Sequence, residues 1–228
     1  THIANIDPNI KTADQDDQLG TAHAVKMASH LIKDDEKILI LYGDVPLISS
    51  KTIEGLINSG HECTLLTMQL NDPSGYGRVI TNGQNLALKI VEQKDASEDE
   101  LKIEEVFTGV LLIDGSLLRT ALEEIKNQNS ANEYYLTDLV EILSRKGVKI
   151  KCIQANPTEV LGANNKHELH ELELILRKMS AEKLLEQGVT LIDKTRVDVR
   201  GKVVAGKDCS IDVNVILEGD VTFGNNVI

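Results

Sequence analysis

The chain has 228 residues, of which 41% are hydrophobic and only 3% aromatic, so we expect an aliphatic core in one large domain, with or without an appendage. Its 24 basic and 36 acidic residues give a formal net charge of −12. This charge disfavours nucleic acid or an anionic membrane as a partner of the whole surface, while a local basic pocket for a nucleotide stays open. The absence of a long apolar run, of a signal peptide and of paired cysteines predicts a cytoplasmic protein with no membrane partner.

The first organised stretch is a polar loop, residues 14–20, which contains Gln15 and leads into a helix. Gly20 or Thr21 starts that helix, and apolar residues recur at helical spacing as far as Ile32. A helix start offers free backbone N–H groups, and Thr21 adds a hydroxyl, so a base or a phosphate is a possible ligand. On spacing alone, an ordinary helix cap is the favoured explanation.

The apolar run that ends at Tyr42 is followed by Gly43 and Asp44. A run of this kind predicts a strand that is buried on both faces and leaves Asp44 at its carboxyl end. Ligands bind at that edge of open α/β sheets, and Mg²⁺ commonly takes one or two protein carboxylates. Asp44 is therefore either a metal ligand or a turn residue, and this stretch alone leaves the two interpretations even.

The next part of the chain alternates strands with helices, which predicts an α/β domain with a mainly parallel sheet. Asn82-Gly83 between two apolar segments predicts a β-hairpin within it. The loop before this hairpin contains Gly77, which could bring its backbone close to a ligand, and Arg78, which could offer a bidentate fork. Turn chemistry alone also explains this loop. The expected strands are 38–42, 63–70, 79–81, 86–91, 105–113 and 148–154, with helices at 51–58, 117–125 and from about 138 to 147.

A long helix is predicted from Ala163 to Gln187, with Gly188 as its C-cap. His167 and His170 lie on this helix, where a polar exposed face is favoured over a zinc pair. Beyond the helix, small aliphatic residues recur every six positions in two interleaved registers. This period predicts the start of a left-handed parallel β-helix. The registers are Val203, Cys209, Val215, Val221, Val227 and Ala205, Ile211, Leu217, Phe223.

Taken together, five motifs closely resemble the bacterial bifunctional N-acetylglucosamine-1-phosphate uridylyltransferase/glucosamine-1-phosphate acetyltransferase family. The resemblance runs in order from about Gln15 to Ile228. The motifs are Gln18-Leu19-Gly20-Thr21, Leu41-Tyr42-Gly43-Asp44-Val45-Pro46-Leu47, Asp72-Pro73-Ser74-Gly75-Tyr76-Gly77-Arg78, Glu133-Tyr134-Tyr135-Leu136-Thr137-Asp138 and Gly162-Ala163-Asn164-Asn165.

The resemblance implies a Rossmann-like nucleotidyltransferase domain with a mixed sheet over residues 1–164, a linking helix over 165–188, and a first β-helix coil over 189–228. Because the chain starts at Thr1 and stops in mid-pattern, we expect both ends to be cut. The family's first strand and its Gly-x-Gly-Thr-Arg loop would then be missing, as would most of the acetyltransferase. We expect little or no activity from the 228 residues alone.

The resemblance also implies roles for individual residues, with no catalytic residue beyond those that position metal and substrate. Gln15, Gly20 and Thr21 would contact uracil, and Tyr42 and Gly43 would line the nucleotide and sugar site. The main chain of Gly77 and the side chains of Glu92 and Thr137 would contact the amino sugar or its phosphate. Asp44 and Asn164 would bind Mg²⁺. The family has Asn where this chain has Phe107, which cannot hydrogen-bond a sugar hydroxyl, so either the ring stacks on the sugar or another side chain compensates.

The implied reaction is attack of N-acetylglucosamine-1-phosphate on the α-phosphorus of UTP, which gives UDP-N-acetylglucosamine and pyrophosphate. The full-length protein would also acetylate glucosamine-1-phosphate from acetyl-CoA, as a homotrimer that feeds cell-wall and lipopolysaccharide synthesis. Two alternatives remain. The first is a non-catalytic, nucleotidyltransferase-like regulatory or assembly subunit, and the second is a sugar nucleotidyltransferase for another base or sugar.

Overall fold

The computed structural model describes Asp7 and residues 9–228, which form two compact units. The first unit comprises the described residues up to Gly43 together with Ile48–Val160, and the second comprises Asp44–Leu47 and Leu161–Ile228. The chain thus enters the second unit twice. The expected division at residues 164 and 188 stays a prediction.

The first unit is built on a six-stranded sheet in the order β1-β5-β2-β6-β4-β3, in which β3 also pairs with β5. The mixed α/β class predicted from the sequence is confirmed. The strands are β1 (Lys37–Ile40), β2 (Cys63–Gln69), β3 (Arg78–Thr81), β4 (Leu86–Val91), β5 (Glu105–Asp114) and β6 (Ile150–Gln154).

The expectation of a mainly parallel sheet is wrong. Only β2 and β6 pair in parallel, and the pairs β1–β5, β2–β5, β3–β4, β3–β5 and β4–β6 are antiparallel. The cause is β5, which lies between β1 and β2 and runs against both. Helix α2 (Ser50–Ile57) connects β1 to β2, so these strands run the same way without being neighbours. The hairpin predicted at Asn82-Gly83 is confirmed by the β3–β4 pair.

The apolar run before Asp44 predicted a strand buried on both faces, and this prediction is wrong. β1 lies at the edge of the sheet, and its only strand partner among the described residues is β5. Ile38, Leu39 and Ile40 are therefore half-buried, and Leu41 is exposed. An edge strand has a neighbour on one side only, so the same apolar run is less covered than it would be in the middle of the sheet.

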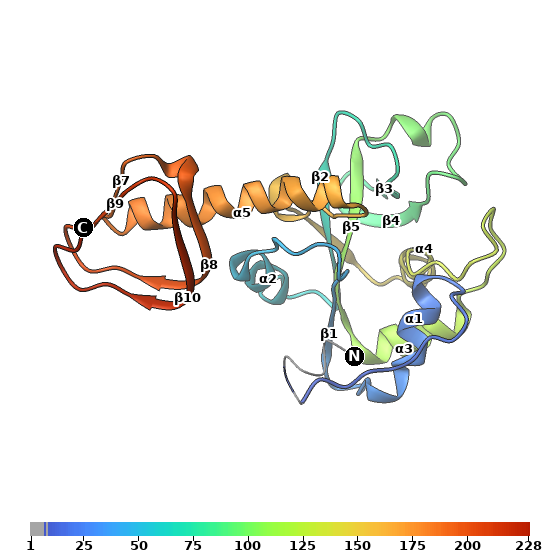
Figure 1. Cartoon of the computed structure of the whole chain (residues 1–228). Coiled ribbons are helices and arrows are strands. Elements are labelled where there is room, and N and C mark those ends of the chain that lie inside the picture. Colours follow the sequence, from blue (N-terminus) through green and yellow to red (C-terminus); the bar gives the residue numbers. More distant parts are fainter. Residues whose placement is uncertain (1–6, 8) are drawn as a thin grey trace. The chain divides into compact units, whose positions relative to one another are not determined.

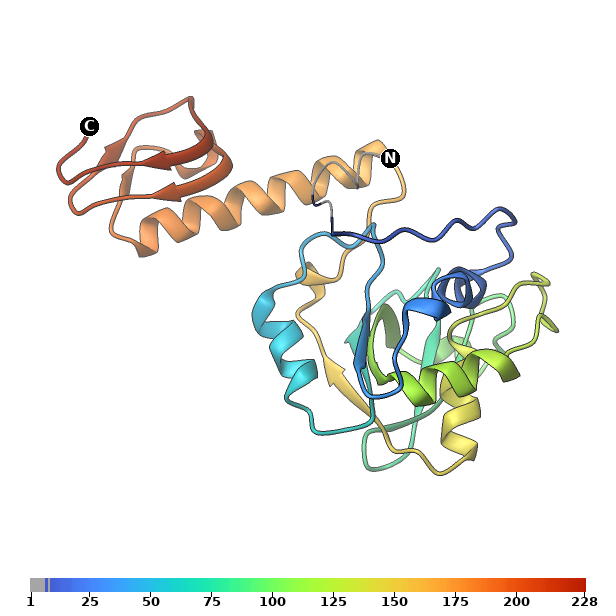
Figure 2. The same cartoon turned by 90° about the horizontal axis from the view of Figure 1, so that it is seen from below.

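The helices of the first unit cover both faces of its sheet. Figures 1 and 2 show α2 on one face and α1, α3 and α4 on the other. Helix α1 spans Thr21–Met27, α3 spans Gly115–Glu124 and α4 spans Asp138–Arg145. The apolar pattern had continued to Ile32, but a 3-10 turn at Ser29–Leu31 replaces the last part of α1. Among the described residues, no helix has both the length and the apolar character needed to cross a membrane.

The core of this unit is aliphatic, as the composition predicts. Side chains of β2, β5 and β6 pack with those of α3 and α4, and β4 is the strand that α4 contacts most extensively. Helices α3 and α4 bury their apolar sides in this core, because Leu118, Leu139 and Leu143 have no exposed surface. This core holds the loops at the sheet edges in place.

The second unit contains helix α5 (Lys166–Glu186) and four short strands. Asn165 caps the helix by accepting hydrogen bonds from the amides of His167 and Glu168. The strands are β7 (Thr190–Leu191), β8 (Val197–Val204), β9 (Ser210–Ile211) and β10 (Val215–Thr222).

Both strand pairs of the second unit are parallel, β7 with β9 and β8 with β10. Val197 pairs with Val215 and Val204 with Thr222, so partners on β8 and β10 are 18 residues, or three hexapeptides, apart. Apart from Val227, the residues of the two six-residue registers pack in one apolar cluster. This arrangement agrees with the hexapeptide period, and the continuation into a β-helix stays a prediction.

Candidate functional site

The three residues expected at the uracil lie together in the first unit. The side-chain amide of Gln15 donates to the carbonyl of Gly20, with 3.2 Å between nitrogen and oxygen, and lies 3.1 Å from Nδ1 of His23. Gly20 precedes α1 with φ +113°, and no side chain caps the helix. Gly20 is thus the N-cap residue of α1, which agrees with the favoured explanation of an ordinary helix cap, here made without a capping side chain.

Gly20 is a glycine because the backbone of Tyr134 passes directly over it. A Cβ atom at residue 20 would lie 2.6 Å from the Tyr134 carbonyl oxygen. Two main-chain hydrogen bonds join these segments, from Tyr134 N to Leu19 O at 2.8 Å and from Ala22 N to Tyr134 O at 2.9 Å. The hydroxyl of Thr21 accepts from the amide of Leu136 at 2.9 Å. Two motifs more than a hundred residues apart in the sequence thus form one edge of the site.

Gly77, Glu92 and Thr137 also lie together, as the sugar assignment requires. The Thr137 hydroxyl donates to Oε1 of Glu92 at 2.9 Å, and a Cβ atom at residue 77 would lie 3.5 Å from both Glu92 carboxylate oxygens. Burial raises the pKa of Glu92, the hydrogen bond from Thr137 opposes that rise, and Asp95 and Glu133 add to it. Gly77, Glu92 and Thr137 thus form a polar site with a half-buried carboxyl group, close to the edge that Gly20 and Thr21 form.

Tyr42 packs on the glycine of the Phe107-Thr108-Gly109 motif. Gly109 has φ +84°, and a Cβ atom there would lie 2.5 Å from Cδ2 of the Tyr42 ring. A Cβ atom at Gly43 would meet nothing within 4 Å, so packing in the described chain does not require that glycine. Phe107 is only 6% exposed and belongs to the apolar core, so its ring offers no open face for stacking on a sugar.

The two residues expected to bind Mg²⁺ belong to the second unit. The amide of Ala163, next to Asn164, donates to the carbonyl oxygen of Asp44 at 3.0 Å. The Glu168 carboxylate accepts hydrogen bonds from the backbone nitrogen of Asn164 at 2.7 Å and from its side-chain nitrogen Nδ2 at 3.3 Å. Within the described chain, no three His, Cys, Asp or Glu side chains come together where they could hold a metal ion. Any metal here would therefore depend on few protein ligands.

The sequence of the first unit matches a known family. Residues 1–156, more than half of the chain, match the sequence pattern of the nucleotidyl transferase family. The chain belongs to this family. The matched residues include all six strands of the sheet in the first unit.

Two relatives carry the similarity beyond the nucleotidyl transferase region. The bifunctional protein GlmU of Idiomarina loihiensis is 45% identical over 218 residues, which is 94% of this chain and 48% of that protein. The bifunctional protein GlmU of Burkholderia multivorans is 45% identical over 223 residues, which is 96% of this chain and 49% of that protein. These matches confirm the resemblance that the motifs predicted. The chain spans about half the length of these relatives.

A more distant match comes from solved structures. A crystal structure from Bacillus anthracis, provisionally named a glucose-1-phosphate thymidylyltransferase, matches with a TM-score of 0.49 and 18% identity. The match covers 72% of this chain and 61% of that one. A similarity this low carries no argument about function.

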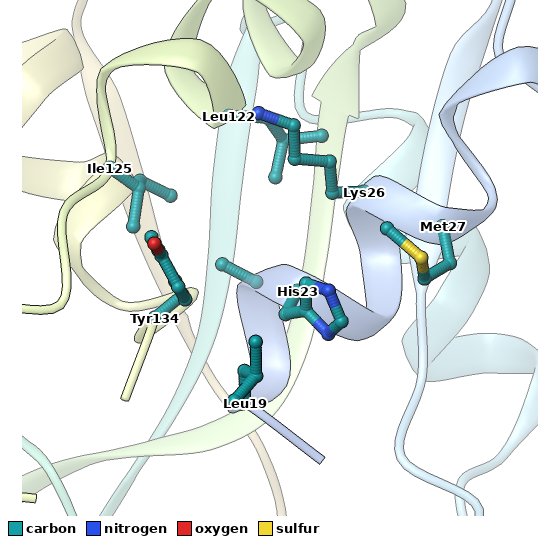
Figure 3. A pocket seen from close by; sticks show the side chains of 8 residues that line it. Leu19, His23, Lys26, Met27, Leu122, Ile125 and Tyr134 are labelled. Atoms are coloured by element: carbon teal, nitrogen blue, oxygen red, sulfur yellow. The ribbon is translucent and has the colours of Figure 1, made fainter. Parts of the chain in front are cut away.

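A pocket of about 260 Å³ lies beside α1, and Leu19, Ala22 and Tyr134 of the site edge contribute to its lining. Figure 3 shows His23 and Met27 of α1 on one side of the view, Ile125 and Tyr134 on the other, and Lys26 and Leu122 at the top. None of the expected substrate or metal residues lines it. Lys26 is paired with Glu123 at 3.3 Å, so its charge is already partly balanced.

Two residues of the site region were not singled out by the sequence. Gln93 follows Glu92 and accepts hydrogen bonds from the loop that contains Gly77. Asp138 follows Thr137, and burial, with the nearby charges of Glu141, Glu92 and Asp95, raises its pKa to about 6. Each residue directly follows an expected contact residue, and Asp138 also ends the Glu133-Tyr134-Tyr135-Leu136-Thr137-Asp138 motif, which are the signals that the sequence offered for them.

Proposed function

We propose that this chain is the uridylyltransferase part of an enzyme that makes UDP-N-acetylglucosamine and pyrophosphate from UTP and N-acetylglucosamine-1-phosphate. In the full-length protein, a trimeric β-helix would acetylate glucosamine-1-phosphate with acetyl-CoA. The observation that carries the proposal is the 45% identity to two proteins named bifunctional GlmU over nearly the whole of this chain. That identity includes a nucleotidyl transferase region in which the expected contact residues cluster.

The proposed roles follow the two groups of residues in the first unit. Gln15, Gly20 and Thr21 select the uracil through a side-chain amide, backbone groups and a hydroxyl. On the sugar side, Glu92 and Thr137 present hydrogen-bonding oxygens, and the main chain of Gly77 can approach because it has no side chain. The site thereby orients both substrates, which is the main contribution that a protein makes to transfer at phosphorus.

Asp44 and Asn164 have the chemistry that Mg²⁺ needs. One carboxylate and one amide carbonyl are hard oxygen donors, and Mg²⁺ usually keeps several waters or substrate phosphates beside one or two protein ligands. When bound, the ion would neutralise charge on the phosphates. Asp44 follows Gly43 directly, so the carboxylate is one residue from the backbone that would line the nucleotide.

No nucleophile or general base is required of this chain, because a phosphate oxygen of the sugar phosphate attacks the α-phosphorus and pyrophosphate leaves. The residues of this chain hold the attacking group and the base of UTP in place. Preorganised donors at the reacting phosphates supply the rest of the stabilisation. Since the chain contains no Gly-x-Gly-Thr-Arg sequence, we propose that the 228 residues alone have little activity.

The test is the Asp44→Ala variant of the full-length protein, with formation of UDP-N-acetylglucosamine measured at several Mg²⁺ concentrations. We expect a loss of about 100-fold or more in rate, the size seen when one preorganised electrostatic group is removed. Asp99→Ala is the matched control, because the Asp99 side chain is 93% exposed and forms an exposed ion pair with Lys102. An unchanged rate in Asp44→Ala would disprove the metal assignment.

A panel of nucleotides and sugar phosphates separates this proposal from its competitors. The proposal requires UTP and N-acetylglucosamine-1-phosphate to be the preferred pair. The choice of sugar phosphate is the more informative part of the panel, because the buried Phe107 stands where the family has an Asn that can hydrogen-bond the sugar. A preference for another base or sugar would favour a related transferase, and no Mg²⁺-dependent binding of UDP-N-acetylglucosamine would favour a regulatory or assembly subunit.

A further inference from the structure

Arg78 is a buried arginine at the candidate site, and its surroundings are unusual for a charged side chain. It is 2% exposed and begins β3, where it pairs with Val91 of β4 and with Val106 of β5. Its Nε atom is buried and has no hydrogen-bond partner among the described residues. Burial of a guanidinium group is costly unless its N–H groups are hydrogen-bonded, so the contacts that the other nitrogens of Arg78 make are needed to keep it here.

The two terminal nitrogens of Arg78 hold the loop that leads to Gly77. Nη1 donates to the carbonyl of Tyr76, and Nη2 donates to Oε1 of Gln93 at 3.3 Å. The same Gln93 oxygen accepts from the amide of Gly75. Arg78 and Gln93 therefore fasten the loop at two points, Gly75 and Tyr76, directly before Gly77.

The loop must be held closely, because little space separates Gly77 from β4. A Cβ atom at residue 77 would lie 2.9 Å from Cγ2 of Ile90, and the Gly77 carbonyl accepts from Phe107 N at 2.9 Å. Gln93 is the residue after Glu92, so the Arg78–Gln93 contact connects the Gly77 loop to the same segment that carries the site carboxyl group. Movement of this loop would change the distance between the Gly77 backbone and Glu92.

We propose that Arg78 and Gln93 form a clamp that positions the Gly77 backbone opposite Glu92 and thereby sets the affinity for the amino-sugar phosphate. The inference rests on the proposed function, in which Gly77 and Glu92 contact that substrate. Arg78 is a positioning residue here, because its nitrogens bind the protein and not the substrate. The uracil residues Gln15, Gly20 and Thr21 lie outside the clamp.

The test compares Arg78→Lys, Gln93→Met and the double variant in the full-length protein. Lysine keeps the charge but lacks the planar fork that reaches two acceptors, and methionine keeps the length of glutamine without its oxygen. We expect each single variant to raise KM for the sugar phosphate roughly tenfold, while kcat and KM for UTP change by less than about threefold. Because both changes break the same clamp, the double variant should also raise KM for the sugar phosphate about tenfold rather than a hundredfold.

Two further variants control for charge and for the acceptor. Arg145→Lys, on the exposed face of α4 where Arg145 pairs with Glu141, should leave both KM values unchanged. Gln93→Glu keeps an acceptor for Arg78 and Gly75 and should restore KM to within about threefold of the unmodified protein. An unchanged KM in Gln93→Met, an equal rise of both KM values, or multiplicative effects in the double variant would each overturn the clamp.

Hydrogen exchange makes the test independent of activity. We expect the amides of Gly75, Tyr76 and Gly77 to exchange at least about tenfold faster in Gln93→Met, with α4 unaffected. If the unmodified protein made no UDP-N-acetylglucosamine, the proposed function would fail, and faster exchange would still support the clamp as a loop-holding contact. Unchanged exchange at these amides would disprove the clamp even in an active enzyme. Gln93→Met decides the question if Arg78→Lys does not fold.

Discussion

Asp138 illustrates how one carboxyl group at the site works against the stability of the fold. It begins α4, where the helix dipole favours a negative charge, yet its pKa rises from 3.8 to about 6. The causes are burial first, and then the charges of Glu141, Glu92 and Asp95. The cost of an ionised group in this place therefore exceeds the benefit from the helix.

The raised pKa predicts a pH-dependent gain in the Asp138→Asn variant. As pH rises from about 4 to 6, the unfolded chain loses this proton before the folded chain does, so the free energy of unfolding falls. Asparagine removes that loss. We expect the variant to be more stable than the unmodified chain by about 1–2 kcal/mol at pH 8, with the difference vanishing towards pH 4.

Urea denaturation at pH 4, 6 and 8 measures this difference. The control is Asp99→Asn, whose carboxylate is almost fully exposed and whose replacement should change stability by less than about 0.5 kcal/mol at each pH. A stability difference between Asp138→Asn and the unmodified chain that did not depend on pH would contradict the prediction.

Helices α2 and α3 each contain a glycine, and their surroundings are opposite. Gly55 lies on the exposed side of α2, where a Cβ atom would meet nothing within 4 Å. Gly115 is buried at the start of α3, its amide donates to Glu36 O, and a Cβ atom would lie 2.0 Å from the carbonyl oxygen of Lys33. One glycine only weakens a helix, and the other allows two segments to touch.

Alanine at these two positions should therefore act in opposite directions. We expect Gly55→Ala to stabilise the chain by about 0.5–1 kcal/mol, because alanine restricts the unfolded chain and suits a helix interior. Gly115→Ala should destabilise it by about 2 kcal/mol or more, since backbone must move to admit the methyl group. Thermal unfolding of both variants measures this, and a stable Gly115→Ala protein would contradict the contact at Lys33.

On the scale of the whole molecule, the reactivity of the three cysteines can show whether each unit is folded, because both units contain at least one of them. Cys63 and Cys152 lie in the first unit, where burial raises the pKa of each thiol to about 12, and Cys209 lies in the second. All three side chains are at most 2% exposed. Each unit thus contains at least one buried thiol.

A thiol reagent at pH 8 should therefore leave all three cysteines unmodified in the folded chain and label all three in denaturant, because only an exposed thiolate reacts. Mass spectrometry at intermediate urea concentrations then shows whether Cys209 becomes reactive separately from Cys63 and Cys152. Rapid labelling of Cys63 without denaturant would contradict the buried β2 strand.

The sequence by itself determined the class of the fold, most element positions and the list of candidate residues. Alternating strand and helix patterns, the Asn82-Gly83 turn and the six-residue period all depend on near neighbours in the chain, so they are visible without a structure. The motif residues were likewise readable one by one. Gly77, Glu92 and Thr137, which the resemblance assigns to the sugar, lie together in the structure, and their role as sugar contacts stays a prediction.

Only the tertiary structure decided the sheet order, the half-burial of β1, and the burial of Phe107 and Arg78. These depend on which distant segments meet: β5 enters between β1 and β2, and Tyr134 passes over Gly20. Sequence patterns record whether a side chain is apolar or can make a turn. The pairing of strands and the burial of a charge depend instead on packing between residues far apart in the chain, and that packing has no local signature.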